Sequence, residues 1–118
     1  METQVFKAQE KESKTFDGGP ARGVTGRILI GRETGAENFC MRLFELAPEG
    51  HTPSHTHDWE HEIFFHEGQG EILANGTWTP VAKGSVAFVP GGVPHQIRNT
   101  GTAPLTFVCL VPKGAPEL

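Results

Sequence analysis

The residues from Gly50 to Gly70 read GHTPSHTHDWEHEIFFHEGQG, and they hold five of the six histidines of the chain. The sixth, His95, lies in a second ordered run, GSVAFVPGGVPHQIRN, from Gly84 to Asn99. Alternate residues of an extended strand share a face, so His55 and His57 are expected to point the same way. Two imidazoles on one face can converge on one cation at about 2.0–2.1 Å each. The two runs therefore predict a metal site where they meet, with polar surface histidines as the alternative interpretation.

Residues beside these histidines extend the candidate site. His61 follows the H-x-H pair, Glu62 stands next to it, and His95 is preceded by the turn residues PGGVP. The sequence has no H-E-x-x-H, no G-x-S-x-G and no C-x-x-C. These absences exclude a helical zinc-protease motif, a hydrolase nucleophile elbow and a finger-type zinc site. We interpret His51 and His66 as histidines that do not bind the metal.

Length and composition limit the fold and the partners. The 118 residues are enough for one domain, and the net charge of −4 argues against nucleic acid as a partner. No apolar stretch approaches the roughly 20 residues that span a bilayer, and the first residues lack the apolar core of a signal peptide. We therefore expect a cytoplasmic protein with no membrane partner. In that setting Cys40 and Cys109 are expected to be buried free thiols.

Short apolar runs separated by glycine and proline predict an all-β fold. Asn75-Gly76 is a strong hairpin signal, because both residues tolerate positive φ. No helical periodicity of useful length is found. Many short strands with regular turn signals indicate a sandwich or a barrel. The strands are expected at 27–30, 39–47, 62–65, 71–74, 78–82, 85–89, 95–98 and 105–111, with extended backbone at 55–57.

The chain is expected to divide into a barrel over residues 21–113 and two short ends. Residues 1–20 are polar and charged, which favours a frayed tail or an edge strand lent to a neighbouring subunit. Residues 114–118 form a C-terminal tail. Pro48, Glu49 and Gly50 are expected to end the strand that begins at Phe39, and Gly68 to Gly70 are expected to form a turn.

Both histidine runs resemble the motifs of the cupin superfamily. The second cupin motif, G(x)5PxG(x)2H(x)3N, matches Gly84, Pro90, Gly92, His95 and Asn99 at every position. The first, G(x)5HxH(x)3-4E(x)6G, is matched within one residue at each end by the run from Gly50 to Gly70. The resemblance covers about half of the chain and implies a small single-domain cupin of the cupin_2 type. The fold it implies is an RmlC-like jelly roll, or double-stranded β-helix.

A narrower resemblance concerns the metal ligands. The run HTHDWEHEIF, together with RILIG, NFCMRLF and FVCLVP, is similar to small bacterial cupins with a four-histidine manganese site. In these proteins the histidine after the H-x-H pair is the third ligand and the usual glutamate does not bind the metal. The resemblance implies the ligands His55, His57, His61 and His95. Glu62 remains the alternative third ligand, or a catalytic acid or base.

The resemblance also implies a cofactor and a pocket. One divalent transition metal per chain is expected, manganese by resemblance, although imidazole also suits Fe, Cu, Ni and Zn. Four neutral imidazoles leave the charge of the dication uncompensated, which would attract an anionic ligand. The substrate-pocket candidates are Phe107 and Cys109, which the resemblance places inside the barrel, and Arg42 and Trp59.

The function implied is a metal-dependent small-molecule oxidoreductase of dioxygenase type. Its partners would be a small substrate, in one interpretation anionic, and O2. Two alternatives stay open: a redox-neutral lyase or isomerase in which Glu62 moves a proton, and a non-catalytic module that binds or senses a small ligand. Small cupins commonly pair, so the resemblance also implies a homodimer.

Overall fold

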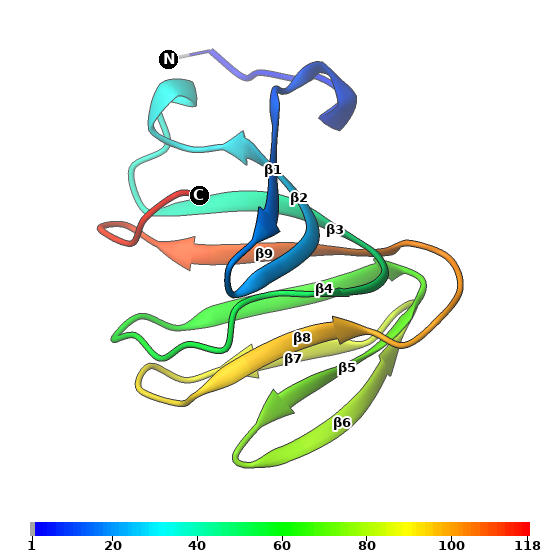
Figure 1. Cartoon of the computed structure of the whole chain (residues 1–118). Helices are drawn as coiled ribbons and strands as arrows, with labels where there is room; N and C mark the ends of the chain where they lie inside the picture. The colour runs from blue at the N-terminus through cyan, green and yellow to red at the C-terminus, as the bar shows by residue number, and fades with distance from the viewer. Residues whose placement is uncertain (1) are drawn as a thin grey trace.

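The computed structural model describes residues 2–118, and almost all of its regular structure is β (Figure 1). The strands are β1 (Ser13–Gly18), β2 (Ala21–Ile30), β3 (Phe39–His51), β4 (His61–Glu67), β5 (Gln69–Ala74), β6 (Thr77–Ala82), β7 (Val86–Val89), β8 (His95–Asn99) and β9 (Leu105–Pro112). Two short 3-10 helices, η1 (Ala8–Glu10) and η2 (Arg32–Thr34), lie outside the barrel walls. Among residues 2–118 no helix has the length and apolar character needed to cross a bilayer.

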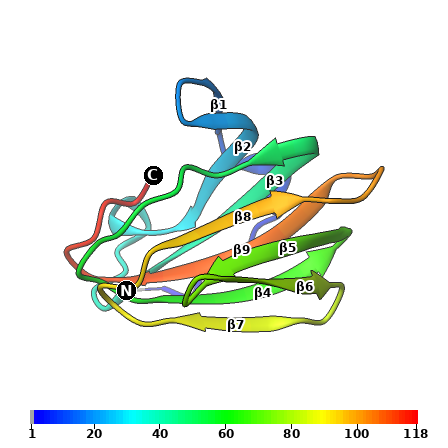
Figure 2. The same cartoon turned by 60° about the horizontal axis from the view of Figure 1, so that its bottom comes forward.

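The strands form one antiparallel sheet that curls into a nearly closed barrel. They pair in the order β6-β5-β8-β3-β9-β4-β7, and β2 and β1 continue the sheet from β3. The two ends of this order, β6 and β7, lie near one another in Figure 2, and residues of both strands line one hollow. Partners such as β3 and β9, or β5 and β8, are far apart in sequence, which is the crossover pattern of a jelly roll. The all-β jelly-roll fold expected from the sequence is confirmed.

The core fills the inside of this barrel through strand alternation. On β9 every second residue is buried, beginning with Leu105 and ending with Val111. β4 alternates in the same way, so that Ile63 and Phe65 point inward while Phe64 is exposed on the outer face. On β3 the inward face carries Cys40 and Arg42. The sequence alone did not decide which face of this strand points inward, because both faces hold apolar residues. The barrel thus places one face of β3, β4 and β9 toward a shared interior.

The ends of the chain pack against the barrel. β1 pairs with β2 of the same chain in an antiparallel ribbon, so the N-terminal region contains an edge strand within this protomer. The C-terminal tail folds back: Ala115 is buried, and Glu117 accepts a hydrogen bond from the backbone N–H of Arg32 at 2.9 Å. Cys40 and Cys109 are both buried and free, as expected.

Candidate metal centre

The two histidine runs are joined directly through their backbones. His55 and His95 form an isolated antiparallel bridge, in which each backbone N–H donates to the other's carbonyl at 3.2 and 3.1 Å. Next to this bridge, the N–H of Gly92 donates a hydrogen bond to the carbonyl of His57 at 2.7 Å. Thus the turn before β8 fixes the loop that carries the H-x-H pair. Chain segments 40 residues apart meet at one end of the barrel.

β4 supplies the third histidine from the barrel wall. His61 begins this strand and is only 6% exposed, because it belongs to the inward-facing set with Ile63 and Phe65. Adjacent residues of a strand face opposite sides. Glu62 therefore points outward, where it lies beside Phe88 of β7 and Leu110 of β9. The geometry does not support Glu62 as a ligand or as an acid or base within the barrel.

Four histidines converge at this end of the barrel: His55, His57, His61 and His95. Each offers a ring nitrogen, and these atoms all lie within 4.8 Å of one another. Two atoms on opposite sides of one ion are separated by about 4.2 Å, twice a metal–nitrogen distance of about 2.1 Å. The Nε2 atoms of His57 and His61 are 3.0 Å apart, a spacing suited to neighbouring ligands. The four side chains are positioned to bind one metal ion.

Hydrogen bonds on the far side of the rings set two of them for ligation. The Nδ1 atom of His57 lies 3.1 Å from the carbonyl of Trp59, and Nδ1 of His95 lies 2.9 Å from the carbonyl of Val93. A carbonyl only accepts, so each Nδ1 carries the proton and each Nε2 presents a lone pair to the cluster. The Nε2 atom of His95 is buried without a hydrogen-bond partner. A metal ion would satisfy this atom, so the residues present fit the cofactor.

His61 has a different partner, a thiol. Its Nδ1 lies 3.2 Å from Sγ of Cys109 and 3.4 Å from Nη2 of Arg42. A guanidinium carries only donors, so the sulfur is the group able to accept a hydrogen bond from Nδ1–H of a metal-binding His61. Nη2 of Arg42 also donates to this sulfur, at 3.1 Å. Cys109 therefore orients His61 as the backbone carbonyls orient the other two rings.

Replacement of Cys109 should weaken metal binding. Cys109→Val keeps a similar shape but removes the acceptor for His61, and we expect a loss of about tenfold in metal affinity, at the low end of what losing such a partner costs. Cys109→Ser keeps an acceptor oxygen and should remain closer to wild type. Competition with a chromophoric chelator measures both affinities. Equal affinity of the valine variant and wild type would contradict this role.

The environment of the cluster favours the neutral form of His55, His57 and His61. Burial is the main cause that lowers the pKa of His55 to about 4 and that of His61 to about 3, and the charge of Arg42 acts in the same direction. Burial also lowers the pKa of His57. Ligating imidazoles must be unprotonated, so at pH 7 these side chains are ready for a metal.

These pKa shifts predict that the metal-free protein loses stability in acid. Below about pH 6.5 the unfolded chain protonates these histidines, whereas the folded chain resists protonation of His55 until about pH 4 and of His61 until about pH 3. The unfolded state then binds more protons, so the free energy of unfolding should fall as the pH drops from about 6.5 toward 3. Above about pH 6.5 these histidines are unprotonated in both the folded and the unfolded state, so they do not lower the free energy of unfolding there. Denaturant melts of chelator-treated protein at pH 7, 5 and 4 measure it.

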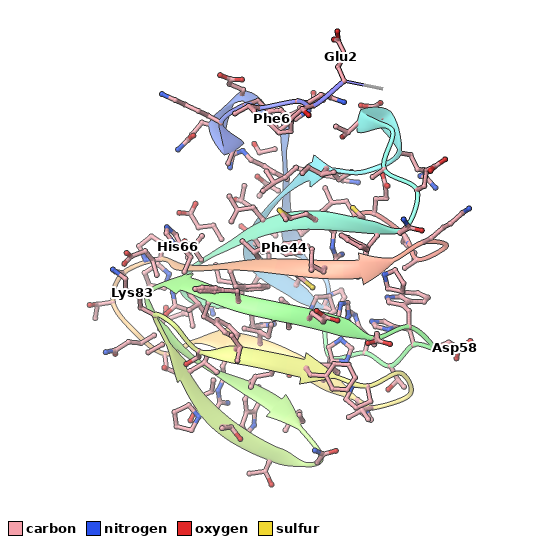
Figure 3. The ribbon with its side chains drawn as sticks, turned by 180° about the vertical axis from the view of Figure 1, so that it is seen from behind. Glu2, Phe6, Phe44, Asp58, His66 and Lys83 are labelled. Atoms are coloured by element: carbon pink, nitrogen blue, oxygen red, sulfur yellow. The ribbon has the colours of Figure 1, made fainter. Side chains whose placement is uncertain are left out.

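Two histidine variants test this acid sensitivity, one inside the cluster and one outside it as the control. His61→Gln should lessen the fall between pH 7 and 4, because it removes one of the two strongly shifted groups. His66→Gln leaves the cluster intact and should keep the full fall. His66 is exposed and lies at the opposite end of the barrel from the loop with Asp58 (Figure 3). An identical pH profile for wild type and His61→Gln would contradict the prediction.

The four histidines line a cavity of about 450 Å³ in the barrel interior. The four pocket candidates from the sequence, Arg42, Trp59, Phe107 and Cys109, also line it. The Trp59 ring stacks on His57 with centroids 4.1 Å apart and planes 6° apart, which restrains the ligand ring. Within residues 2–118, no Asp or Glu belongs to the lining. The cavity is therefore mainly apolar, with its polar groups concentrated at the histidines and Arg42.

Several lining residues were missed by sequence reasoning. Phe44 follows Arg42 at the i+2 position of β3, and strand alternation could have found it. Phe16 of β1 and Pro116 and Leu118 of the tail also line the cavity. They come from the two ends of the chain, outside both motifs, and no local signal marks them. His51, by contrast, lies outside the cluster, with its Nδ1 3.2 Å from the carbonyl of Thr52.

A family profile matches the part of the sequence that forms this site. The profile Cupin_2, described as the cupin domain, matches residues 42–111, which include both histidine runs. The chain is a cupin. The cupin resemblance stated from the motifs is thereby confirmed, and the four-histidine cluster is present in the structure.

Relatives of known name extend the comparison. This cupin is 35% identical over 98 residues to an oxalate-binding protein of Thermotoga maritima, covering 76% of this chain and 79% of that protein. It is 30% identical over 93 residues to a 1-methylthio-D-xylulose 5-phosphate methylsulfurylase of Rhodospirillum rubrum. That match covers 78% of this chain and 58% of the relative, so the cupin spans less than two thirds of the methylsulfurylase's length.

Solved structures agree with the fold and the sequence relation. The polyketide cyclase RemF from Streptomyces resistomycificus superposes with a TM-score of 0.88 at 30% identity, over 98% of this chain and 82% of that chain. A predicted oxalate decarboxylase from Thermotoga maritima superposes with a TM-score of 0.82 at 26% identity, over 92% of this chain and 98% of that chain. Both likenesses extend well beyond the two motifs.

Proposed function

We propose that this cupin is a metal-dependent enzyme that acts on a small, largely apolar molecule bound through oxygen atoms. The observation that carries the proposal is the convergence of four histidines on the wall of one apolar cavity. A cavity of about 450 Å³ is in the range that holds small-molecule ligands. Similarity to proteins named for oxalate and for a polyketide supports a ligand that presents oxygen atoms to the site.

The four imidazoles would hold one divalent ion, and we propose manganese as the native metal. Fe, Cu, Ni and Zn also suit imidazole ligands. When bound, the ion would supply Lewis acidity and open positions for oxygen donors. The chain's own residues bind and enclose the substrate: Phe16, Phe44 and Phe107 offer aromatic surface to an apolar body. Trp59 holds His57 in place by ring stacking and by its backbone carbonyl, which accepts a hydrogen bond from Nδ1–H of His57.

For the reaction we propose an oxidoreductase of dioxygenase type. A redox-neutral lyase or isomerase depends on a side chain that moves a proton at the substrate. The lining described within residues 2–118 contains no Asp or Glu side chain, and its histidines are those of the metal cluster. Glu62, the proton carrier considered from the sequence, lies on the outer face. Oxidation by O2 depends less on acidic and basic side chains than a redox-neutral lyase or isomerase does, because the cofactor carries the redox chemistry.

A redox-neutral reaction is the second candidate, favoured by the likeness to RemF. That structure covers 98% of this chain at 30% identity and belongs to a polyketide cyclase. A cyclase of this kind would require the substrate's own acidic C–H groups to react once the molecule is oriented in the cavity. The two candidates therefore share the binding site and differ in their need for O2.

Oxygen dependence separates these functions. Manganese-loaded protein would be tested on a panel of small aromatic molecules that carry carboxylate, carbonyl or hydroxyl oxygens, with an oxygen electrode and in an anaerobic chamber. Substrate-dependent oxygen uptake, lost in His57→Ala, is expected for the dioxygenase. Turnover without oxygen would exclude the dioxygenase and support the redox-neutral reaction. Tight binding of one compound with no turnover would instead indicate a binding or sensing module.

The homodimer and the cytoplasmic location stay predictions. An exposed apolar area on the outer faces of β4 and β7 supports pairing: Phe64 is 45% exposed, Phe88 61% and Val86 78%. Burying such side chains against a second copy would remove apolar surface from water. Light scattering should therefore give the mass of two chains, and Phe88→Asp should lower it to one. A wild-type monomer would contradict the prediction.

A further inference from the structure

Arg42 is a buried cation in the wall of the cavity. It lies on the inward face of β3 and is 9% exposed. Its guanidinium packs 4.9 Å from the ring centroid of Phe44, the next inward-facing residue of the same strand. Nη2 donates to Sγ of Cys109 at 3.1 Å, whereas Nε is buried with no hydrogen-bond partner. The guanidinium is thus held in place by Phe44 and Cys109, while its Nε–H makes no hydrogen bond.

The positive charge of Arg42 has no carboxylate partner. The ion pairs formed by residues 2–118 join Arg22, Arg32, Lys83 and Arg98 to glutamates, and Arg42 is in none of them. A guanidinium remains charged in proteins. A buried charge is unfavourable unless it is paired and hydrogen-bonded. An anion entering the cavity would supply the missing partner.

The rest of the lining points to the same ligand chemistry. No Asp or Glu lines the cavity within the described chain, and the four cluster histidines are neutral ligands. A bound dication would therefore keep its full charge beside that of Arg42. Around these groups the lining is aromatic and aliphatic, including Phe16, Phe44 and Phe107. The cavity thus combines a positive region, formed by Arg42 and a bound dication, with walls that are otherwise apolar.

We propose that Arg42 is the anion-binding residue of the cavity and that the physiological ligand is an aromatic carboxylate. The planar fork of a guanidinium matches the two oxygens of a carboxylate, and Arg42 lines the cavity with its charge unpaired. The aromatic part of the ligand packs against the phenylalanine side chains. This proposal deepens the proposed function, because it rests on the same cavity being the ligand site and names the class of molecule bound there.

The test uses two matched probes on metal-free protein. 2-Naphthoate carries the carboxylate, and 2-naphthamide has the same ring system and shape without the charge. Calorimetric titration of wild type should give at least about tenfold tighter binding of the acid, since hydrogen bonds to charged groups are the stronger ones. Arg42→Gln should remove this preference by weakening 2-naphthoate about tenfold and leaving 2-naphthamide unchanged. Arg22→Gln alters an exposed arginine outside the lining and should retain the preference.

Three outcomes would overturn the proposal: no preference in wild type, an unchanged preference in Arg42→Gln, or no binding of either probe. An unchanged preference would leave Arg42 as a residue that only positions Cys109. If Arg42→Gln does not fold, the two probes on wild type still decide, and Arg42→Lys, which keeps the charge without the fork, should bind 2-naphthoate with intermediate affinity. Since no metal is present, failure here is distinct from failure of metal binding, which is titrated separately with Mn(II).

Discussion

Replacing His61 with alanine should weaken metal binding by at least about 100-fold, whereas Glu62→Gln should bind metal as wild type does. Loss of a hydrogen-bond partner of a ligand already costs about 10–100-fold, and loss of the ligand itself should cost at least the upper value. His61 is buried in the cluster, and its Nε2 lies 3.0 Å from that of His57. Glu62 points to the outer face of β4. Metal content after gel filtration and chelator competition measure both variants.

The pair of variants is matched, because the two residues are neighbours on one strand and differ in the face they occupy. Circular dichroism with thermal melts would reveal a fold defect in either variant. The opposite result, with metal lost in Glu62→Gln and kept in His61→Ala, would show that β4 is shifted by one residue. Such a shift would reverse every inward and outward position of the strand. The experiment therefore tests the register of β4 as well as the ligand set.

The sequence predicted the barrel well where turns and apolar runs are strong. Asn75 and Gly76 form the hairpin between β5 and β6, and both have positive φ. It failed at β1, whose residues SKTFDG are mostly exposed and show no apolar alternation. This strand exists because its backbone pairs with β2, which local patterning cannot show.

Two other boundaries were wrong for a physical reason. Pro48 to Gly50 do not end β3, which continues to His51 through an irregularity where the register with β2 shifts. Glu49 there has φ of 68°, and Gly23 on the opposite strand has φ of 60°, so strand-breaking residues mark a bulge. Gly68 to Gly70 also do not form one turn, because β5 begins at Gln69. Turn-forming residues show where the backbone bends, whereas pairing decides whether the strand continues.

The site was predictable to the extent that short motifs encode it. Spacing and resemblance named the four histidines, because each is delivered by a turn or strand end next to it in sequence. The role of Cys109 as the acceptor for His61 depends on β4 pairing with β9, across 48 residues. The unpaired charge of Arg42 depends on strands far apart in sequence, which bring no Asp or Glu side chain of residues 2–118 into the lining of the cavity. Such facts arise from tertiary packing and have no local signature.

Gly91→Ala should disrupt the metal site, although the cupin motif marks the next glycine. A Cβ at position 91 would lie 2.0 Å from the backbone oxygen of Asp58, in the loop directly after His57 (Figure 3). Ordinary contact begins at 3.4 Å, so the two atoms must separate by at least about 1.4 Å, and a displacement of about 1 Å in a site can already cost about 100-fold. The same turn also holds the loop through the hydrogen bond from Gly92 N–H to His57. We therefore expect metal affinity to fall by about 100-fold, measured by chelator competition.

Gly92→Ala is the matched control and should affect stability more than metal binding. Nothing lies within 4 Å of a Cβ at position 92, but its φ of 81° is unfavourable for alanine and should cost about 1–2 kcal/mol of unfolding free energy. Denaturant melts measure that cost, while metal affinity should stay within a few-fold of wild type. If Gly91→Ala binds metal normally, the loop can move away without displacing His57. The four ligands would then be held by the His55–His95 bridge and by β4, because the contact between the turn and the loop would contribute nothing to their placement.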